Sequence, residues 1–508
     1  MKPGLALLML AAPIAVAFPA AASARDAKVT SFDGTSINVH FFPAAHLKKA
    51  RRVPTVLVGP GWGQTGQTDD NSKTAPGAGV VGLGALRRAG YNVLTWDPRG
   101  FGASTGTVEV DSPKFEGRDV SALIGFVAKQ PEAQLDKKGD PRVGMAGGSY
   151  GGGIQLVAAA IDHRIDAIVP DIAWNSLETS LAKNKTTKSG WGLTLYAAAA
   201  AAGARLDPQL GIAATQAAQS FQQDAKSIAF FRSRGPGRLT ARIKAPTLLI
   251  QGTVDTLFTL QEAVDNYELL AARRVPVKML WFCGGHGVCL TKAGDTRRIQ
   301  RDTLAWLARY LKGRKTARTG PGFEWLDQNG HSYDAPKWPL PSAPGLSGRG
   351  SGTLQLVDAG GSGPAVVPPG SLGALPGSVA GLFAAAKAGN AVDVPIRAPK
   401  KTTVIVGAPR VSFSYRGTAP SANARVLAQI VDEGTGKVLG NQITPLPVTL
   451  DGATHSLSLP LEMVAATAKR GSRFMLQLVA QSKIYDTHPQ GGSVAFSKVN
   501  VTLPGVRP

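Results

Sequence analysis

Cysteine is scarce, since the 508 residues include only Cys283 and Cys289. A zinc site built on cysteine needs more ligands than this pair offers, so no metal site is predicted, and no motif indicates a cofactor. The two cysteines flank His286. In an oxidising compartment they would close a small disulfide loop around that histidine, and otherwise they would stay as two buried thiols. The sequence leaves both states open.

Beyond the N-terminus the sequence has no apolar run long enough to span a membrane. The alanine stretch 197–202 is too short. The N-terminus itself combines Lys2, the apolar run Leu5–Ala17 and the small-residue pattern Ala22-Ser23-Ala24. These features are typical of a secretory signal peptide over residues 1–24. We therefore predict cleavage after Ala24 and a secreted or periplasmic protein without a transmembrane segment. An uncleaved membrane anchor is the alternative.

Acidic residues are outnumbered, with 34 Asp and Glu against 56 Lys and Arg, which gives a formal net charge of +22. The basic residues are scattered along the chain rather than gathered into a stripe with interleaved aromatic residues. This pattern argues against a nucleic-acid partner. A secreted protein of this charge would be attracted to anionic cell-envelope polymers, although solubility is the simpler explanation.

The chain is too long for one compact domain. Between residues 25 and 315, short apolar strands alternate with helices, which predicts an α/β domain whose mostly parallel sheet is covered on both faces. A long insertion, about 174–244, has helical stretches and is expected to form a cap over the strand ends. A linker or domain junction rich in Lys, Arg, Gly, Pro and Ser is predicted at 316–348, with a strand and turn at 323–330 that pack at the junction. The short β-like runs over 349–508 then predict an all-β sandwich of the jelly-roll type.

The strongest motif is Gly147-Gly148-Ser149-Tyr150-Gly151, which follows the predicted strand Val143–Met145 and precedes the helix-like run Ile154–Ala160. A serine at such a strand-to-helix turn has strained backbone angles and an exposed hydroxyl, as in the α/β-hydrolase fold. The glycines are needed because side chains there would collide with the neighbouring strand and helix. Ser149 is therefore the predicted nucleophile.

A serine hydroxyl needs a base to take its proton. Chain order in this fold is serine, acid, histidine, which excludes the histidines before Ser149. His163 follows too soon, and the last histidines lie in the predicted linker or β domain. His286 follows the last predicted strand, Val277–Phe282, in a glycine-rich loop. We predict that His286 is the general base.

The acid that orients the histidine is expected at the end of the preceding strand. The segment Gln251-Gly252-Thr253-Val254-Asp255 ends an apolar strand with a glycine turn and a carboxylate. Asp255 is the predicted acid. Asp171, which follows the strand that ends at Pro170, is the competitor.

The tetrahedral oxyanion needs two hydrogen-bond donors. One is the backbone N–H of Tyr150, the residue after the nucleophile. The other is predicted to be the backbone N–H of Trp62, in a glycine turn after the strand Thr55–Val58; alternatively, Trp62 belongs to the core. Asp97 and Arg99, which follow another strand, are expected to brace their loop by ion pairing.

Taken together, these motifs resemble the S15 serine peptidases, the X-Pro dipeptidyl-peptidase and cocaine-esterase group with its CocE/NonD-type hydrolases. The matching segments are Gly147–Gly152 (G-x-S-Y-x-G), Asp97–Gly106 (D-x-R-G-x-G-x-S-x-G), Gly252–Asp255, Gly285–His286 and, in the β region, Gly407–Asp432. The resemblance implies an α/β-hydrolase domain followed by a jelly-roll, galactose-binding-like domain. It also implies that Ser149, Asp255 and His286 form the triad.

In well-known members of this group a Pro-Tyr pair donates its phenol to the oxyanion, whereas this chain has Pro60-Gly61-Trp62. The oxyanion hole would then consist of backbone N–H groups. The predicted activity is two-step acyl transfer on a peptide or small ester, with the peptidase assignment implied by the resemblance and a carboxylesterase as the close alternative. Two other hypotheses are a lipase with an interfacial cap and a non-catalytic, cationic envelope-binding protein.

Overall fold

The computed structural model describes residues 24–48, 50–74, 81–295, 297–367, 381–485 and 490–508. The predicted signal peptide therefore lies outside the described residues, apart from Ala24. None of the helices in these ranges is long and apolar enough to cross a membrane.

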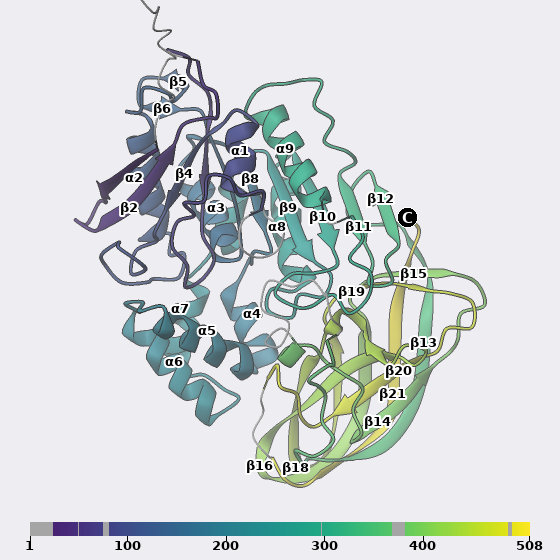
Figure 1. Cartoon of the computed structure of the whole chain (residues 1–508). Helices are drawn as coiled ribbons and strands as arrows, with labels where there is room; N and C mark the ends of the chain where they lie inside the picture. The colour runs from purple at the N-terminus through teal and green to yellow at the C-terminus, as the bar shows by residue number, and fades with distance from the viewer. Residues whose placement is uncertain (1–23, 49, 75–80, 296, 368–380, 486–489) are drawn as a thin grey trace, which may run out of the picture.

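In the described part of the chain, ten strands form one sheet in the order β1-β2-β4-β3-β7-β8-β9-β10-β11-β12 (Figure 1). The strands are β1 (Arg25–Thr30), β2 (Ser36–Phe42), β3 (Thr55–Val58), β4 (Asn92–Trp96), β7 (Val143–Gly148), β8 (Ile165–Asp171), β9 (Thr247–Gly252), β10 (Val277–Phe282), β11 (Phe323–Leu326) and β12 (Ser332–Ala335). Neighbours from β4 to β11 are parallel. The predicted, mostly parallel sheet is confirmed.

Helices cover both faces of this sheet. They are α1 (Leu83–Arg88), α2 (Glu116–Val127), α3 (Tyr150–Ile161), α8 (Leu260–Ala272) and α9 (Arg298–Tyr310), and a small hairpin consists of β5 (Leu135–Lys137) and β6 (Asp140–Pro141). The apolar sides of α2, α3 and α8 share one hydrophobic core. Those of α1 and α9 pack in a second core on the opposite face. Because both faces are covered, every residue of strands such as β3 and β4 is buried.

The insertion between β8 and β9 forms a helical cap, seen in Figure 1 as a separate group of helices beside the sheet. Its elements are α4 (Leu177–Leu181), η1 (Lys183–Lys185), α5 (Ser189–Ala201), α6 (Pro208–Gln219), α7 (Ala225–Arg232) and η2 (Gly237–Arg242). The carboxylate of Asp207 accepts from the backbone N–H of Gln209 and so caps α6, which begins with Pro208. Asp224 caps α7 in the same way.

The C-terminal part is an all-β domain, in which the described residues form a nine-stranded sheet with antiparallel pairing. Its elements are β13 (Ser342–Gln355), β14 (Ala391–Ile396), β15 (Thr403–Gly407), β16 (Arg410–Asp432), β17 (Lys437–Val438), η3 (Leu439–Asn441), β18 (Thr444–Pro460), β19 (Val464–Ala468), β20 (Phe474–Val479) and β21 (Ser493–Val506). The predicted all-β class of this region is confirmed.

The segment 316–348, predicted as a linker or domain junction with a strand and turn at 323–330, is structured. Strands β11 and β12 lie within it and extend the first sheet, with Phe323 paired to Met279 of β10. Strand β13 of the β domain already begins at Ser342. Strand β11 lies within the strand and turn expected at 323–330, whereas β12, also only four residues long, was not expected. Their anchors are the fully buried rings of Phe323 and Trp325, which stack on each other.

The turn at the start of α3 lies unusually close to the loop after β3. A Cβ atom added to Gly151 would lie 2.1 Å from the carbonyl oxygen of Gly59. Since both neighbours are backbone, neither can rotate away, and the contact needs glycine.

We expect Gly151→Ala to lower the free energy of unfolding by about 1–3 kcal/mol, because the added methyl group overpacks this contact. Chemical denaturation measures the change. The matched control is Gly125→Ala in α2, where an added Cβ would meet nothing within 4 Å. The control is expected to be neutral or stabilising, since alanine favours helix. Equal stability of the two variants would contradict this account.

Candidate active site

The structure brings together the serine, histidine and aspartate that the sequence singled out. Oγ of Ser149 lies 2.7 Å from Nε2 of His286. Nδ1 of His286 lies 2.8 Å from Oδ2 of Asp255. The three residues follow β7, β10 and β9, so they meet at the carboxyl ends of strands in one parallel sheet, where such folds bind ligands.

Ser149 stands on a strained turn between β7 and α3. Its φ and ψ are 57° and −119°, a conformation that residues with a side chain rarely adopt. Its backbone N–H donates to the carbonyl of Asp171 at 2.9 Å and holds the turn against β8. The strain directs the hydroxyl away from the sheet toward His286.

The carboxylate of Asp255 is fully buried and receives hydrogen bonds on both oxygens. Oδ2 accepts from the backbone N–H of His286 at 3.0 Å in addition to its contact with the ring. Oδ1 accepts from the backbone N–H groups of Leu257 and Phe258 at 2.9 and 3.0 Å. These donors satisfy the oxygens of a buried carboxyl group and hold it in place beside the imidazole. At Gly285, with φ of 111°, a Cβ would lie 2.6 Å from Asp255, which explains the glycine before the histidine.

Asp171, the competitor for the acid, ends β8 in a different environment. Neither of its carboxyl oxygens has a hydrogen-bond partner among the described residues, and the side chain is buried. Burial, together with the nearby charge of Asp255, raises the pKa of the Asp171 carboxyl well above its usual range. A carboxyl group without a contact to His286 does not orient the imidazole.

Tyr150 and Trp62 pack against each other beside the nucleophile, with ring centroids 5.3 Å apart. As the first residue of α3, Tyr150 has a backbone N–H that no carbonyl of its own helix accepts. The indole N–H of Trp62 donates to the carbonyl of Leu195 in α5 at 2.8 Å. Trp62 therefore connects the loop after β3 to the cap instead of filling the core of the sheet.

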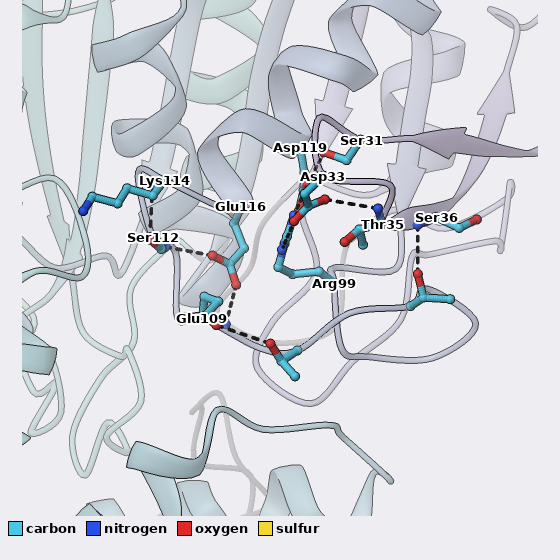
Figure 2. A network of polar contacts seen from close by, with 12 residues as sticks. Ser31, Asp33, Thr35, Ser36, Arg99, Glu109, Ser112, Lys114, Glu116 and Asp119 are labelled. Atoms are coloured by element: carbon cyan, nitrogen blue, oxygen red, sulfur yellow. Dashed lines mark hydrogen bonds and ion pairs between the residues drawn. The ribbon is translucent and has the colours of Figure 1, made fainter.

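The buried carboxyl group of Glu116 binds the Tyr150 hydroxyl, and the sequence did not indicate this contact. The Tyr150 hydroxyl donates to Oε1 of Glu116 at 3.3 Å. Glu116 also accepts from the backbone N–H groups of Glu109 and Ser112, as Figure 2 shows. Burial raises the pKa of Glu116 to about 7. Burial, with the nearby charge of Glu116, also raises the pKa of Tyr150 well above its usual range, so the phenol keeps its proton.

Arg99 braces its loop by ion pairing, but its partner is not Asp97. Its guanidinium lies between Asp119, at 2.7 Å, and Asp33, at 3.0 Å (Figure 2). Asp97 instead accepts from the backbone N–H groups of Gly66 and Ala103. Asp97 thus holds backbone in place and Arg99 joins two side chains, and both lie outside the contact between Ser149 and His286.

A turn around η3 in the β domain contacts both catalytic loops. The side-chain amide of Gln442 donates to the carbonyl of Asp255 at 2.6 Å. The amide of Asn441 donates to the carbonyl of Val288, two residues after His286, at 2.8 Å. These contacts join residues far apart in the chain, and no local pattern in the sequence marks them.

Cys283 and Cys289, whose state the sequence left open, form a disulfide on either side of His286. The bond closes the histidine loop at its base. Within the described ranges, no group of three or more His, Cys, Asp and Glu side chains is arranged to hold a metal ion.

A pocket of about 810 Å³, including its open mouth, leads from Ser149 under the cap. Its walls come mainly from α4 to α7 and from the turn that follows Asp255. Leu177, Leu195, Leu210 and Phe231 are typical of the lining. The hydroxyl of Ser149 is thus reached from an apolar chamber that the insertion builds.

Three solved structures share this fold over nearly the whole chain. An aminopeptidase from the marine sediment archaeon Thaumarchaeota archaeon is 14% identical, with a TM-score of 0.70 and 96% of each chain covered. A CocE/NonD family hydrolase from Staphylococcus aureus is 13% identical, with a TM-score of 0.68 and coverage of 95% of this chain and 93% of that one. An α-amino acid ester hydrolase is 15% identical, with a TM-score of 0.62 and coverage of 97% of this chain and 99% of that one. At these identities the likeness shows the fold alone.

Two curated relatives, both uncharacterised 31.7 kDa proteins of Escherichia coli, match over 90 residues at 36% and 34% identity. These matches cover 18% of this chain and only 30% of each relative's length. The family model of the X-Pro dipeptidyl-peptidases (S15 family) matches residues 33–287, half of the 508 residues, and includes all three residues of the serine–histidine–aspartate contact. The chain therefore belongs to the X-Pro dipeptidyl-peptidase (S15) family and is a serine hydrolase of ester or peptide bonds.

Proposed function

We propose that Ser149, His286 and Asp255 hydrolyse their substrate through an acyl-enzyme. The observation that supports this most directly is the unbroken hydrogen-bonded series from Ser149 Oγ to His286 at 2.7 Å and on to Asp255 at 2.8 Å. Nε2 of His286 takes the hydroxyl proton while Oγ forms a bond to the substrate carbonyl carbon. The protonated imidazole then gives that proton to the departing alcohol or amine. Asp255 holds the ring and stabilises its charged form.

Deacylation repeats these steps with water. His286 takes a proton from a water molecule, whose oxygen attacks the acyl carbon, and returns it to Ser149 Oγ as the acid leaves. We propose that the backbone N–H groups of Tyr150 and Trp62 stabilise the oxyanion in both steps. Two features support them over a phenol: the segment Pro60-Gly61-Trp62 contains no tyrosine, and the Tyr150 hydroxyl is engaged by Glu116.

Export is a second part of the proposal. The N-terminal pattern that ends in Ala22-Ser23-Ala24 supports removal of a signal peptide, after which β1 would begin directly at Arg25. The disulfide between Cys283 and Cys289 supports a secreted or periplasmic location, because such bonds persist in oxidising compartments. We also propose a jelly roll for the all-β domain, supported by its antiparallel pairing throughout.

Ser149→Ala is expected to abolish labelling by a fluorophosphonate probe and to reduce ester turnover by at least about 10³-fold, because no other hydroxyl takes its place beside His286. In-gel fluorescence and a p-nitrophenyl acetate assay measure both effects. The matched control is Ser180→Ala, a buried cap serine outside the contact series. Labelling that survives Ser149→Ala would place the nucleophile elsewhere.

The two buried aspartates are expected to respond differently to the same isosteric change. Asp255→Asn removes the charge that stabilises the imidazolium, so kcat should fall by roughly 10³–10⁴-fold. Asp171→Asn changes a side chain that has no hydrogen-bond partner among the described residues and no contact with His286, so kcat should stay within about threefold of the parent. Steady-state kinetics on one ester measures kcat of both variants against the parent. A larger loss in the Asp171 variant would reverse the assignment.

Gln442→Met is expected to lower kcat about five- to tenfold while KM changes little, since the variant loses a hydrogen bond of about 1 kcal/mol that positions Asp255. Gln355→Met, on an exposed position of β13, is the control and should leave both constants unchanged. Melting temperatures of the variants separate positioning from general destabilisation. A fall in kcat that simply follows the fraction unfolded at the assay temperature would show that Gln442 has a structural role only.

A further inference from the structure

The side chains that line the pocket under the cap indicate which acyl groups it can bind, which the family assignment does not. Helix α6 contributes Leu210, Ala213 and Ala217, and α4 contributes Leu177 and Leu181. These side chains lie on the path from Ser149, so the acyl part of the substrate that stays on the serine would enter among them. An apolar wall of this kind favours hydrocarbon and gains free energy with each methylene group buried.

No Asp or Glu is found among the described residues that line this pocket. The carboxylates of the cap are all engaged elsewhere. Glu178 forms a bidentate ion pair with Arg232, at 2.6 and 2.7 Å. Asp207 and Asp224 cap the N-termini of α6 and α7. An ammonium group entering the pocket would therefore meet no carboxylate to compensate the loss of its hydration.

The charged side chain that does line the pocket is a lysine. Lys188 is buried, and its ammonium group donates to the carbonyls of Thr256 and Leu257 at 2.9 and 3.1 Å. Burial lowers the pKa of Lys188, with the buried carboxylate of Glu462 opposing that shift. A second cation beside Lys188 would be repelled. A carboxylate in the acyl group would compete with carbonyls that already hold the lysine.

We propose that this pocket binds a neutral, apolar acyl group, so that the enzyme acts on esters or amides of uncharged hydrocarbon acids. Substrates that carry a free α-ammonium group near the scissile bond, as an unblocked dipeptide does, are excluded by the same walls. The inference rests on the proposed function, because it assigns the group that is held on Ser149 during the reaction. It departs from the dipeptidyl-peptidase activity for which the family is named.

A matched pair of esters tests the proposal on the whole protein. p-Nitrophenyl heptanoate and p-nitrophenyl 6-aminohexanoate have chains of equal length, and differ in whether a methyl or an ammonium group ends the chain. We expect kcat/KM to be at least about a hundredfold higher for the heptanoate. Along the series from acetate to heptanoate, kcat/KM should rise about fourfold for each methylene group that enters the pocket, which corresponds to about 0.8 kcal/mol.

Filling the pocket tests its location. Ala213→Trp should bring kcat/KM on heptanoate down toward that on acetate, because the added ring occupies the space that the longer chain would fill. Ile212→Trp changes the neighbouring residue, which is exposed on the same helix, and should leave the whole series unchanged. If Ala213→Trp does not fold, Ala217→Phe fills the same pocket with a smaller ring. If kcat/KM on heptanoate falls equally in the Ile212→Trp control, the proposed location of the acyl group is wrong.

The outcomes separate the substrate class from the catalytic proposal. Fluorophosphonate labelling of Ser149 combined with equal rates on both matched esters, or with faster turnover of the ammonium ester, would overturn the inference alone. A flat profile from acetate to heptanoate would do the same. Absence of labelling and of turnover on every ester would overturn the proposed function itself and the inference with it.

Discussion

The hydrogen bond between His286 and Asp255 is the contact on which the site depends, because it fixes the tautomer and the direction of the imidazole. Its two partners stand on loops after neighbouring strands, β10 and β9. Those strands are paired in parallel with Phe282 opposite Gly252. A slip of one residue between them would turn alternate side chains to the other face and carry the acid away from the ring. The register of the sheet is therefore part of the catalytic geometry.

Restraints from outside the sheet reinforce this contact. The disulfide closes the histidine loop, and the turn around η3 holds a carbonyl in each of the two loops through Asn441 and Gln442. Loops of this kind carry function because a rigid scaffold positions them. The β domain thus contributes to the site without providing any of the three reacting side chains.

The cap connects the pocket to the same loops. Trp191 of α5 donates to Oγ1 of Thr256 at 3.2 Å, and its ring stands edge-on to that of His286 with centroids 6.1 Å apart. Lys188 holds the carbonyls of Thr256 and Leu257. The insertion that we propose to select the acyl group therefore also packs against the turn that follows Asp255. Substrate range can diverge on α4, α6 and α7, whereas the start of α5 is restrained by its contacts with the triad.

The sequence by itself pointed to Ser149 and His286 as the proposed nucleophile and base, because each follows an apolar strand through a glycine turn, and such signals are local. It left Asp171 and Asp255 in competition, since both follow strands in the same manner. Only the tertiary structure decided between them, by giving backbone donors and the imidazole to Asp255 and none to Asp171. Three features were equally beyond the sequence: strand β12, the support from Gln442, and a pocket lining that has no Asp or Glu among the described residues. Each depends on which distant residues become neighbours, and burial and pairing decide that only when the chain is folded.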